Sequence, residues 1–301
     1  MKTFGNLVKR NSKLFFRDKG LFFVSLITPL ILLVLYITFL GNLYRTSFEA
    51  GLPMEFMDIS DDVIDGLVGG QLFSSLLSVC CITIAFCSNM LMVQDKITGA
   101  RNDFLITPVK KSTLALSYYV STFISTFAIS IFAFACCMIY VACVGWFLSF
   151  VDVLLILLDI FMLVMFGTAL SSIINHFLSS QGQISAVGSI VSSCYGFICG
   201  AYMPISNFSE GLRNVVSFLP GTYGTSLLRN HTMGGAIKEL ENIGIPSESI
   251  ASLKDAVDCN IYCFGKSVST GTMYGILIGS IVLLIGVYVL INILHKKRRV
   301  G

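Results

Sequence analysis

Few residues of this sequence have both the type and the spacing that catalysis or nucleotide binding requires. Gly265-Lys266-Ser267 matches the end of a phosphate-binding loop, but the glycine needed five residues before Gly265 is replaced by Asn260. The sequence contains no H-E-x-x-H zinc motif, no G-x-S-x-G nucleophile motif and no paired carboxylates within an apolar run. We therefore predict no catalytic residue and no nucleotide site in this chain.

Asp159 is an acidic residue within a long apolar run, about 12 Å along a helix from Val151 at 1.5 Å per residue. A carboxylate at that depth in a bilayer is costly and usually faces a polar cavity or a polar partner. Two roles stay open: lining of a translocation path, or a structural acid near the interface or hydrogen-bonded between helices. A single acid does not make a proton-coupled carrier, because such carriers hold several buried polar groups.

The ten cysteines and three histidines do not form a metal-binding pattern. Eight cysteines fall in apolar segments, where the thiol behaves as a small hydrophobic group. Cys259 and Cys263 lie in a more polar stretch, where a small disulfide and two unpaired thiols are both possible. Because no histidine lies near a cysteine pair at zinc-ligand spacing, we predict no metal site.

Long apolar runs dominate the chain. Hydrophobic residues make up 55% of its 301 residues and charged residues 12%, about half the charged share of a soluble domain. A helix needs about 20 apolar residues to cross a bilayer core, where backbone groups must be paired within the helix. We therefore predict an all-α, polytopic membrane protein with six transmembrane helices, at Leu21–Leu40, Val68–Val93, within Thr113–Trp146, Val151–Phe177, Ile184–Met203 and Gly271–Leu294.

Basic residues predict the orientation of these spans. Fourteen of the twenty Lys and Arg residues lie in residues 1–20, 92–112 or 295–301. Six spans place all three segments on one side, which the positive-inside rule assigns to the cytoplasm. Both termini are therefore expected there. The first loop on the opposite side is acidic, with Glu49, Glu55, Asp58, Asp61, Asp62 and Asp65.

The segments outside the spans differ in pattern. Residues 1–20 have apolar positions at helical spacing among basic ones, which favours an amphipathic cytoplasmic helix on the membrane surface over a disordered tail. Spans one to five occupy residues 21–203, with a cytoplasmic loop at 92–112. Residues 204–270 are predicted to be extracellular, with a re-entrant helical stretch bracketed by Pro204 and Pro220. The sixth span covers residues 271–294, and residues 295–301 form a basic cytoplasmic tail.

Glycines in the last span have the spacing of a packing motif. Gly271, Gly275 and Gly279 recur every four residues. Small residues at this interval let helix backbones approach closely, which predicts a helix-packing row. Glycine is also frequent in membrane helices without such a role.

The polar segment 92–112 separates two apolar runs on the predicted cytoplasmic side. It mixes acidic and basic residues and carries its own apolar positions at Ile97, Phe104, Leu105 and Ile106. Because a surface that binds only anionic lipid would be purely basic, we expect a docking helix for a cytoplasmic partner.

Three stretches together resemble the ABC-2 type exporter permeases. One is Gln94 to Val109, which includes Gly99 and the sequence Leu-Ile-Thr-Pro-Val. A second is Arg17-Asp18 followed by Pro29, and the third runs from Gly200-Ala201-Tyr202-Met203-Pro204-Ile205 to Leu219-Pro220-Gly221-Thr222-Tyr223. They follow the family's order over most of the chain. The chain departs from the pattern at Gln94, where the family often has Glu, and at Ala100, where it often has Thr.

The resemblance implies a six-span half-transporter in the bacterial plasma membrane. Two such chains, copies or paralogues, would pair around a central path, and each would dock on a separate ABC ATPase subunit that binds ATP and Mg. This chain itself would hold no cofactor and bind no nucleic acid. Family cargoes include drugs, antibiotics, lipids and glycan precursors, and the apolar spans favour an amphipathic one. The resemblance implies ATPase docking through Arg17, Gln94, Asp95, Lys96, Gly99, Arg101, Leu105 and Pro108.

Other classes fit the residues less well. A lipid-modifying enzyme would need clustered His, Asp or Glu at one face of the bilayer, which the sequence lacks. An ATPase-independent channel or ion-coupled carrier would need more polar residues in the spans than Asp159. A non-transporting membrane partner of an ATPase stays open. We interpret the chain as the permease subunit of an ATP-driven exporter, with hydrolysis performed by another chain.

Overall fold

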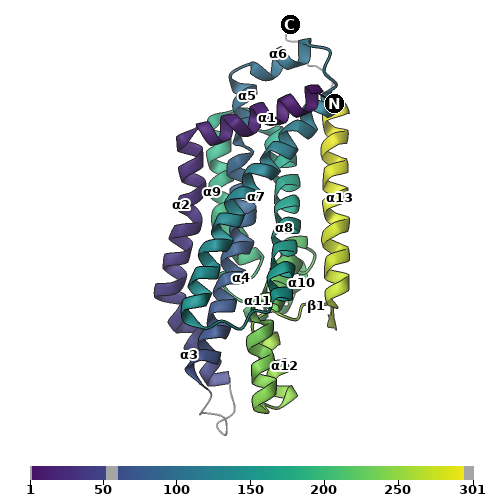
Figure 1. The fold of residues 1–301 in the computed structure, drawn as a ribbon. Helices are drawn as coiled ribbons and strands as arrows, with labels where there is room; N and C mark the ends of the chain where they lie inside the picture. Colours follow the sequence, from purple (N-terminus) through teal and green to yellow (C-terminus); the bar gives the residue numbers. More distant parts are fainter. Residues whose placement is uncertain (1, 52–59, 295–301) are drawn as a thin grey trace.

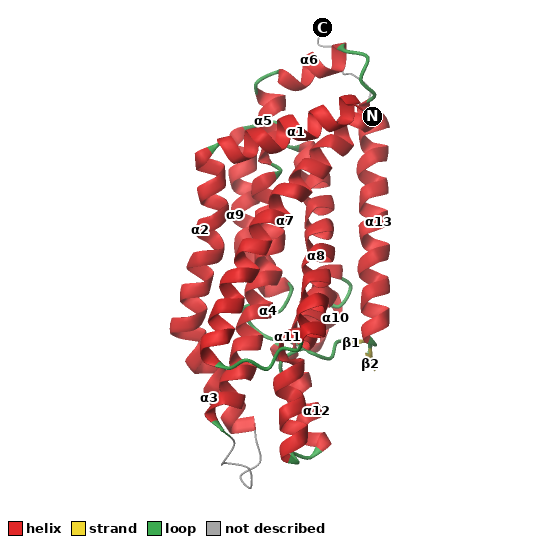
Figure 2. Ribbon diagram, viewed as in Figure 1, coloured by secondary structure: helices red, strands yellow, loops and turns green. Residues whose placement is uncertain are grey.

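The computed structural model describes residues 2–51 and 60–294, and it forms a bundle of long helices with one two-stranded hairpin among these residues (Figures 1 and 2). The predicted tail at 295–301, together with Glu55 and Asp58, lies outside the described residues. The elements are α1 (Lys2–Arg17), α2 (Lys19–Leu35), a π-helical turn (Tyr36–Leu40), α3 (Gly41–Gly51), α4 (Asp61–Ser88), α5 (Met90–Ile97), α6 (Ala100–Ile106), α7 (Lys111–Val144), α8 (Phe150–Phe177), α9 (Gln181–Ile198), a 3-10 turn (Ile205–Asn207), α10 (Glu210–Val216), α11 (Pro220–Ile243), α12 (Ser247–Ala256), β1 (Tyr262–Cys263), β2 (Lys266–Ser267) and α13 (Thr270–Leu294).

Five helical segments of the described chain are long and apolar enough to cross a membrane. They are Phe22–Phe48, Asp61–Ile97, Lys111–Val144, Phe150–Phe177 and Thr270–Leu294. The structure thus confirms helices of this kind at five of the six predicted spans. The count of six is not confirmed, because the run predicted at 184–203 forms α9, which has 18 residues and ends before a turn with φ +74° at Gly200.

The chain therefore crosses the bundle between α8 and α12 in shorter pieces. α9 starts at the end of the bundle where α8 finishes, and α12 lies at the opposite end (Figure 1). Between them, α10 and α11 follow the turn at Gly200, and α11 packs against α4, α8 and α13. Pro220 occupies the first turn of α11, where a missing N–H costs no helical hydrogen bond. Between Pro204 and Pro220, where the sequence predicted a re-entrant helical stretch, the chain forms the 3-10 turn and the short α10, and entry of this stretch into the membrane stays a prediction.

The core of the bundle surrounds α4, which packs against α7, α8 and α11. Every residue of α4 from Gly66 to Phe86 is buried. Close approach to α11 depends on Gly70, because a Cβ there would lie 2.8 Å from the Thr232 carbonyl oxygen. The Thr232 hydroxyl donates to the Gly70 carbonyl at 2.9 Å, which joins the two helices at this crossing.

The predicted packing row on the last span has a different environment. A Cβ added at Gly271, Gly275 or Gly279 would meet nothing within 4 Å in the described part of the chain. No part of the described chain therefore packs directly on this row, and its role in helix packing stays a prediction. Gly70, by contrast, lies on the buried central helix and allows a close approach between two backbones.

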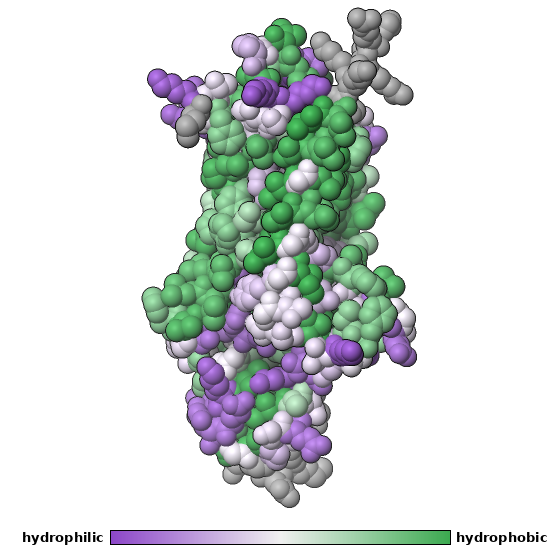
Figure 3. Space-filling model, turned by 90° about the vertical axis from the view of Figure 1, so that its right-hand side faces the viewer, coloured by the Kyte–Doolittle hydropathy of each residue, from purple (hydrophilic) through white to green (hydrophobic). Residues whose placement is uncertain are grey.

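Polar residues gather at the two ends of the molecule. We call them the α6 end, which also holds α1, α5 and the last turn of α13, and the α12 end, which also holds α3 (Figure 1). A broad hydrophobic band covers the body of the bundle between them (Figure 3). α1 lies across the α6 end with Leu7 and Phe15 buried and Lys9 and Lys13 exposed, as its amphipathic pattern predicts.

Candidate functional site

The α6 end is organised around the carboxylate of Asp95 on α5. Arg10 of α1 pairs with both of its oxygens, at 2.5 and 3.1 Å, and the Tyr118 hydroxyl of α7 donates to it at 2.6 Å. The Asp95 side chain is only 7% exposed. Its hydrogen bond raises the pKa of the Arg10 guanidinium, which therefore stays charged. Asp95 thus joins α1, α5 and α7 and has its oxygens occupied inside the chain.

Arg10 also connects α1 to α6. Its guanidinium carbon lies 5.0 Å from the centre of the Phe104 ring on α6, within the range of a cation–π interaction. One side chain of α1 therefore contacts both helices of the 92–112 segment.

Lys96 of α5 holds the end of α8. Its Nζ donates to the carbonyl oxygens of Asn175 and Leu178 at 3.0 and 3.1 Å, and also to that of His176. The last carbonyls of a helix lack intrahelical hydrogen-bond donors and carry the negative end of the helix dipole. A lysine at this position donates hydrogen bonds to these carbonyls and places a basic group at the negative end of the dipole.

Arg101 of α6 reaches the last helix. Its Nη2 donates to Oδ1 of Asn292 on α13 at 3.3 Å, and Asn292 in turn donates to the Tyr288 carbonyl at 2.9 Å. Asn292 is buried, although it lies only two residues before the end of α13. Three polar ties therefore link α5 and α6 to α1 and α7, to α8, and to α13.

α6 itself projects beyond α1 at this end of the molecule (Figure 1). None of its residues is buried, and the Ile106 side chain is 78% exposed. The chain enters α6 through Gly99, whose φ of +82° is a left-handed conformation that other residues adopt at a cost. Gly99 is therefore the position that sets the angle between α5 and α6.

The predicted docking residues divide into groups. Asp95, Lys96 and Arg101 meet at the α6 end, but their side chains tie helices together within the chain. Gln94 and Leu105 are half-buried, and Pro108 is exposed in the turn after α6. Arg17 is exposed at the far end of α1, where α2 begins.

The sequence reasoning missed Arg10, Tyr118 and Asn292. Arg10 had been counted only as part of a basic segment, and Tyr118 only as part of a span. An amide near the end of an apolar helix was a signal for Asn292, because polar groups in such helices usually have a partner.

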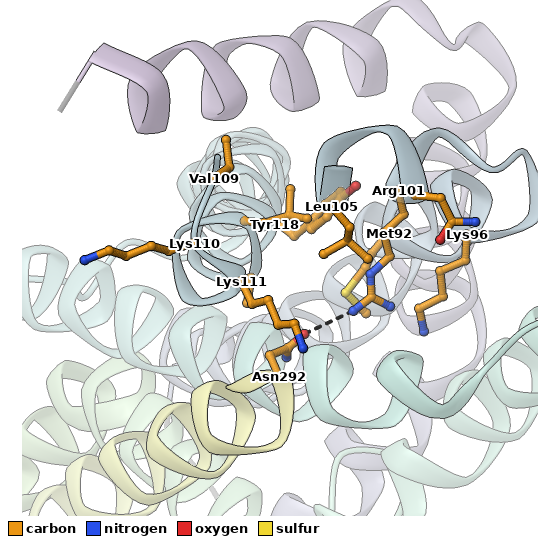
Figure 4. A pocket seen from close by; sticks show the side chains of 12 residues that line it. Met92, Lys96, Arg101, Leu105, Val109, Lys110, Lys111, Tyr118 and Asn292 are labelled. Carbon is orange, nitrogen blue, oxygen red and sulfur yellow. Dashed lines mark hydrogen bonds between the residues drawn. The ribbon is translucent and has the colours of Figure 1, made fainter. Parts of the chain in front are cut away.

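A cavity of about 630 Å³ opens beside these ties, bounded by α5, α6, α7 and the last turn of α13 (Figure 4). Its wall combines apolar side chains with four basic residues, the Tyr118 ring and the amides of Asn102 and Asn292. The basic residues are Lys96, Arg101, Lys110 and Lys111.

Asp159 lies away from this end, between α8, α11 and α13. Its side chain has no exposed surface, and its oxygens contact His231 Nδ1 at 2.6 Å and the Tyr274 hydroxyl at 2.6 Å. Of the two roles left open by the sequence, this geometry is that of an acid hydrogen-bonded between helices. The sequence reasoning missed His231 because 204–270 was predicted to lie outside the spans, and it missed Tyr274 because no local pattern links this residue of the sixth span to Asp159.

A second buried ion pair holds the segment around Gly200. Arg229 of α11 and Asp258 are both buried and lie 3.0 Å apart. Asp258 accepts from the backbone N–H groups of Ile205 and Ser206 at 2.6 and 3.0 Å, and Arg229 donates to the Gly200 carbonyl. The pair therefore fastens the turn after α9 to α11. Cys259 and Cys263 are both free thiols.

These helices define a multi-pass membrane protein. The sequence matches the family model described as ABC-2 type transporter over residues 2–232, so the chain belongs to that family. The resemblance noted from the sequence is confirmed, and the chain is a membrane component of an ABC transport system. No curated protein matches the chain.

Proposed function

We propose that this chain is the permease subunit of an ATP-driven exporter in a bacterial plasma membrane. It would pair with a second permease chain, a copy or a paralogue, around a central path. Each would dock on a separate ATPase that binds ATP and Mg, and this chain would catalyse no reaction. Its cargo would be amphipathic: a drug-like molecule, a lipid or a glycan precursor. Family membership supports the transport role, and the α6 end supports the docking role.

The observation that supports the docking role is the contrast between the exposed end of α6 and the residues behind it, which are bound to other helices of the bundle. Ile106 is exposed on a helix with no buried residue, at the tip of the α6 end, so its side chain is accessible to another protein. Directly behind it, Lys96 and Arg101 are fixed to the ends of α8 and α13. A partner that moves α6 would therefore pull on helices that run the length of the bundle.

The experiment is co-purification from the source membranes in mild detergent, with a tag on the chain and an assay of ATP hydrolysis. We expect a stoichiometric ATPase with the wild-type chain and little of it with Ile106→Asp. The matched control is Ile243→Asp, which places the same charge at an exposed site at the α12 end. Absence of any ATP-hydrolysing partner would refute the proposal and favour a channel or an ion-coupled carrier. Equal recovery with all three chains would refute α6 as the docking element.

A further inference from the structure

The cavity at the α6 end is rich in basic side chains. Arg101 and three lysines line it, the ammonium of one of them, Lys96, being bound to the carbonyls at the end of α8, and its lining, drawn from the described residues, contains no carboxylate. The Asp95 carboxylate lies on α5, the helix that also carries Lys96, but its oxygens are bound by Arg10 of α1 and Tyr118 of α7. Because like charges repel at short range, such a cavity is stabilised by an anion.

The cations approach the cavity from different elements. Arg101 extends from α6 and Lys111 from the start of α7, and the two side chains converge near Asn292 (Figure 4). Arg101 uses one Nη group on Asn292, and a guanidinium has five N–H donors, so further donors remain for a ligand. Lys111 is the first residue of α7, a 34-residue helix whose N-terminus adds the positive end of its dipole. This combination of donors suits a phosphate group.

Part of the cavity wall is apolar. Leu105, Val109 and Leu114 line it beside the cations. On α13, next to Asn292, Ile293 and Leu294 are exposed. A volume of about 630 Å³ exceeds the need of a phosphate alone and lies within the usual range of small-molecule sites. The ligand that matches both walls carries a phosphate on a hydrocarbon.

We propose that this cavity binds the phosphate headgroup of an anionic membrane lipid from the leaflet at the α6 end. The phosphate would contact Arg101 and Lys111, and the acyl chain would leave along the apolar wall toward α13. The bound lipid would bridge α6, α7 and α13 and so brace the segment that carries Ile106. The cavity lies beside the exposed Ile106 and does not include it. Lipid binding there can be measured on this chain without an ATPase, so the test does not depend on the proposed function.

The experiment measures lipid retention by native mass spectrometry on the purified full chain. The probes are dioleoyl phosphatidylglycerol, dioleoyl phosphatidylcholine and inorganic phosphate, each titrated separately. The test variant is Lys110→Gln/Lys111→Gln. The matched control is Lys9→Gln/Lys13→Gln, which removes the same charge from the exposed face of α1 at the same end.

We expect phosphatidylglycerol to bind the wild-type chain and the control with similar affinity, and phosphatidylcholine to bind much more weakly. The test variant should bind phosphatidylglycerol about tenfold more weakly or worse, because it loses charged hydrogen-bond donors to the phosphate. Lys110→Arg/Lys111→Arg should retain binding, and Lys111→Gln alone replaces the test variant if the double variant does not fold.

Three results would overturn the proposal. Equal weakening in the control would show general attraction to a basic surface. Equal binding of the two lipids would show that no headgroup is recognised. Binding of inorganic phosphate as strongly as the lipid would assign the cavity to a free anion instead.

Discussion

The ion pair between Arg10 and Asp95 should contribute measurably to the stability of the folded chain. Removing one partner of a buried pair costs about 3–5 kcal/mol. Here Asp95 is 7% exposed, but Arg10 is 31% exposed and can regain water, which lowers the expected loss. We therefore expect Asp95→Asn to reduce the free energy of unfolding by about 2 kcal/mol. Arg10→Gln should cost about as much, and the double variant little more, because both lose the same contact.

The assay is a double-mutant cycle in which SDS unfolds the purified chain in mixed micelles. The control is Asp61→Asn, since Asp61 pairs with Arg45 but is 81% exposed, and an exposed pair contributes less than about 1 kcal/mol. If the losses of the two single variants simply add in the double variant, the residues are not coupled and the reasoning about this tie is refuted. A loss at Asp61 as large as that at Asp95 would refute the use of burial to rank the two pairs.

Three further substitutions test other parts of the molecule. Gly99→Ala should cost about 1 kcal/mol through its left-handed φ and lower ATPase stimulation in a reconstituted complex, whereas Gly99→Asn should cost less; identical behaviour would contradict the turn's role. Asp159→Ala leaves His231 and Tyr274 without their acceptor and should lower the free energy of unfolding by about 3 kcal/mol. The yield of monodisperse protein should therefore fall, and an unchanged yield would favour the path-lining role. Arg229→Met leaves the buried Asp258 carboxylate without its ion-pair partner, and protease should then cleave near Gly200. Protease resistance equal to that of the wild type would contradict the role of this ion pair in holding the turn after α9.

The helices of this fold follow from the apolar runs, and the break in one of them does not. Residues 184–203 have the length and composition of a span, so the pattern gives no sign that the helix ends at Ile198. The reason lies elsewhere in the chain, where Arg229 and Asp258 fix the turn after it. These two residues are separated by 28 others and lie in the segment 204–270, which was predicted to be extracellular, so no periodicity could reveal their burial.

The α6 end shows the same limit. The resemblance to the family directed attention to Asp95, Lys96 and Arg101, but the expected role was contact with another protein. Their partners are Arg10, the end of α8, and Asn292, and the last contact joins residues 191 positions apart. A local pattern can indicate that a charged residue is important, but it cannot indicate which way the side chain turns.

The separation between an exposed contact and buried ties has a functional consequence. If Ile106 supplies contact while Asp95, Lys96 and Arg101 transmit displacement, substitutions at the two levels should produce different defects. Ile106→Asp should prevent co-purification of the ATPase. Lys96→Met leaves the last carbonyls of α8 without their donor and should preserve co-purification, while transport per ATP hydrolysed falls. Because both residues belong to one short segment, loss of the ATPase in both variants would mean that the segment acts only as an attachment site.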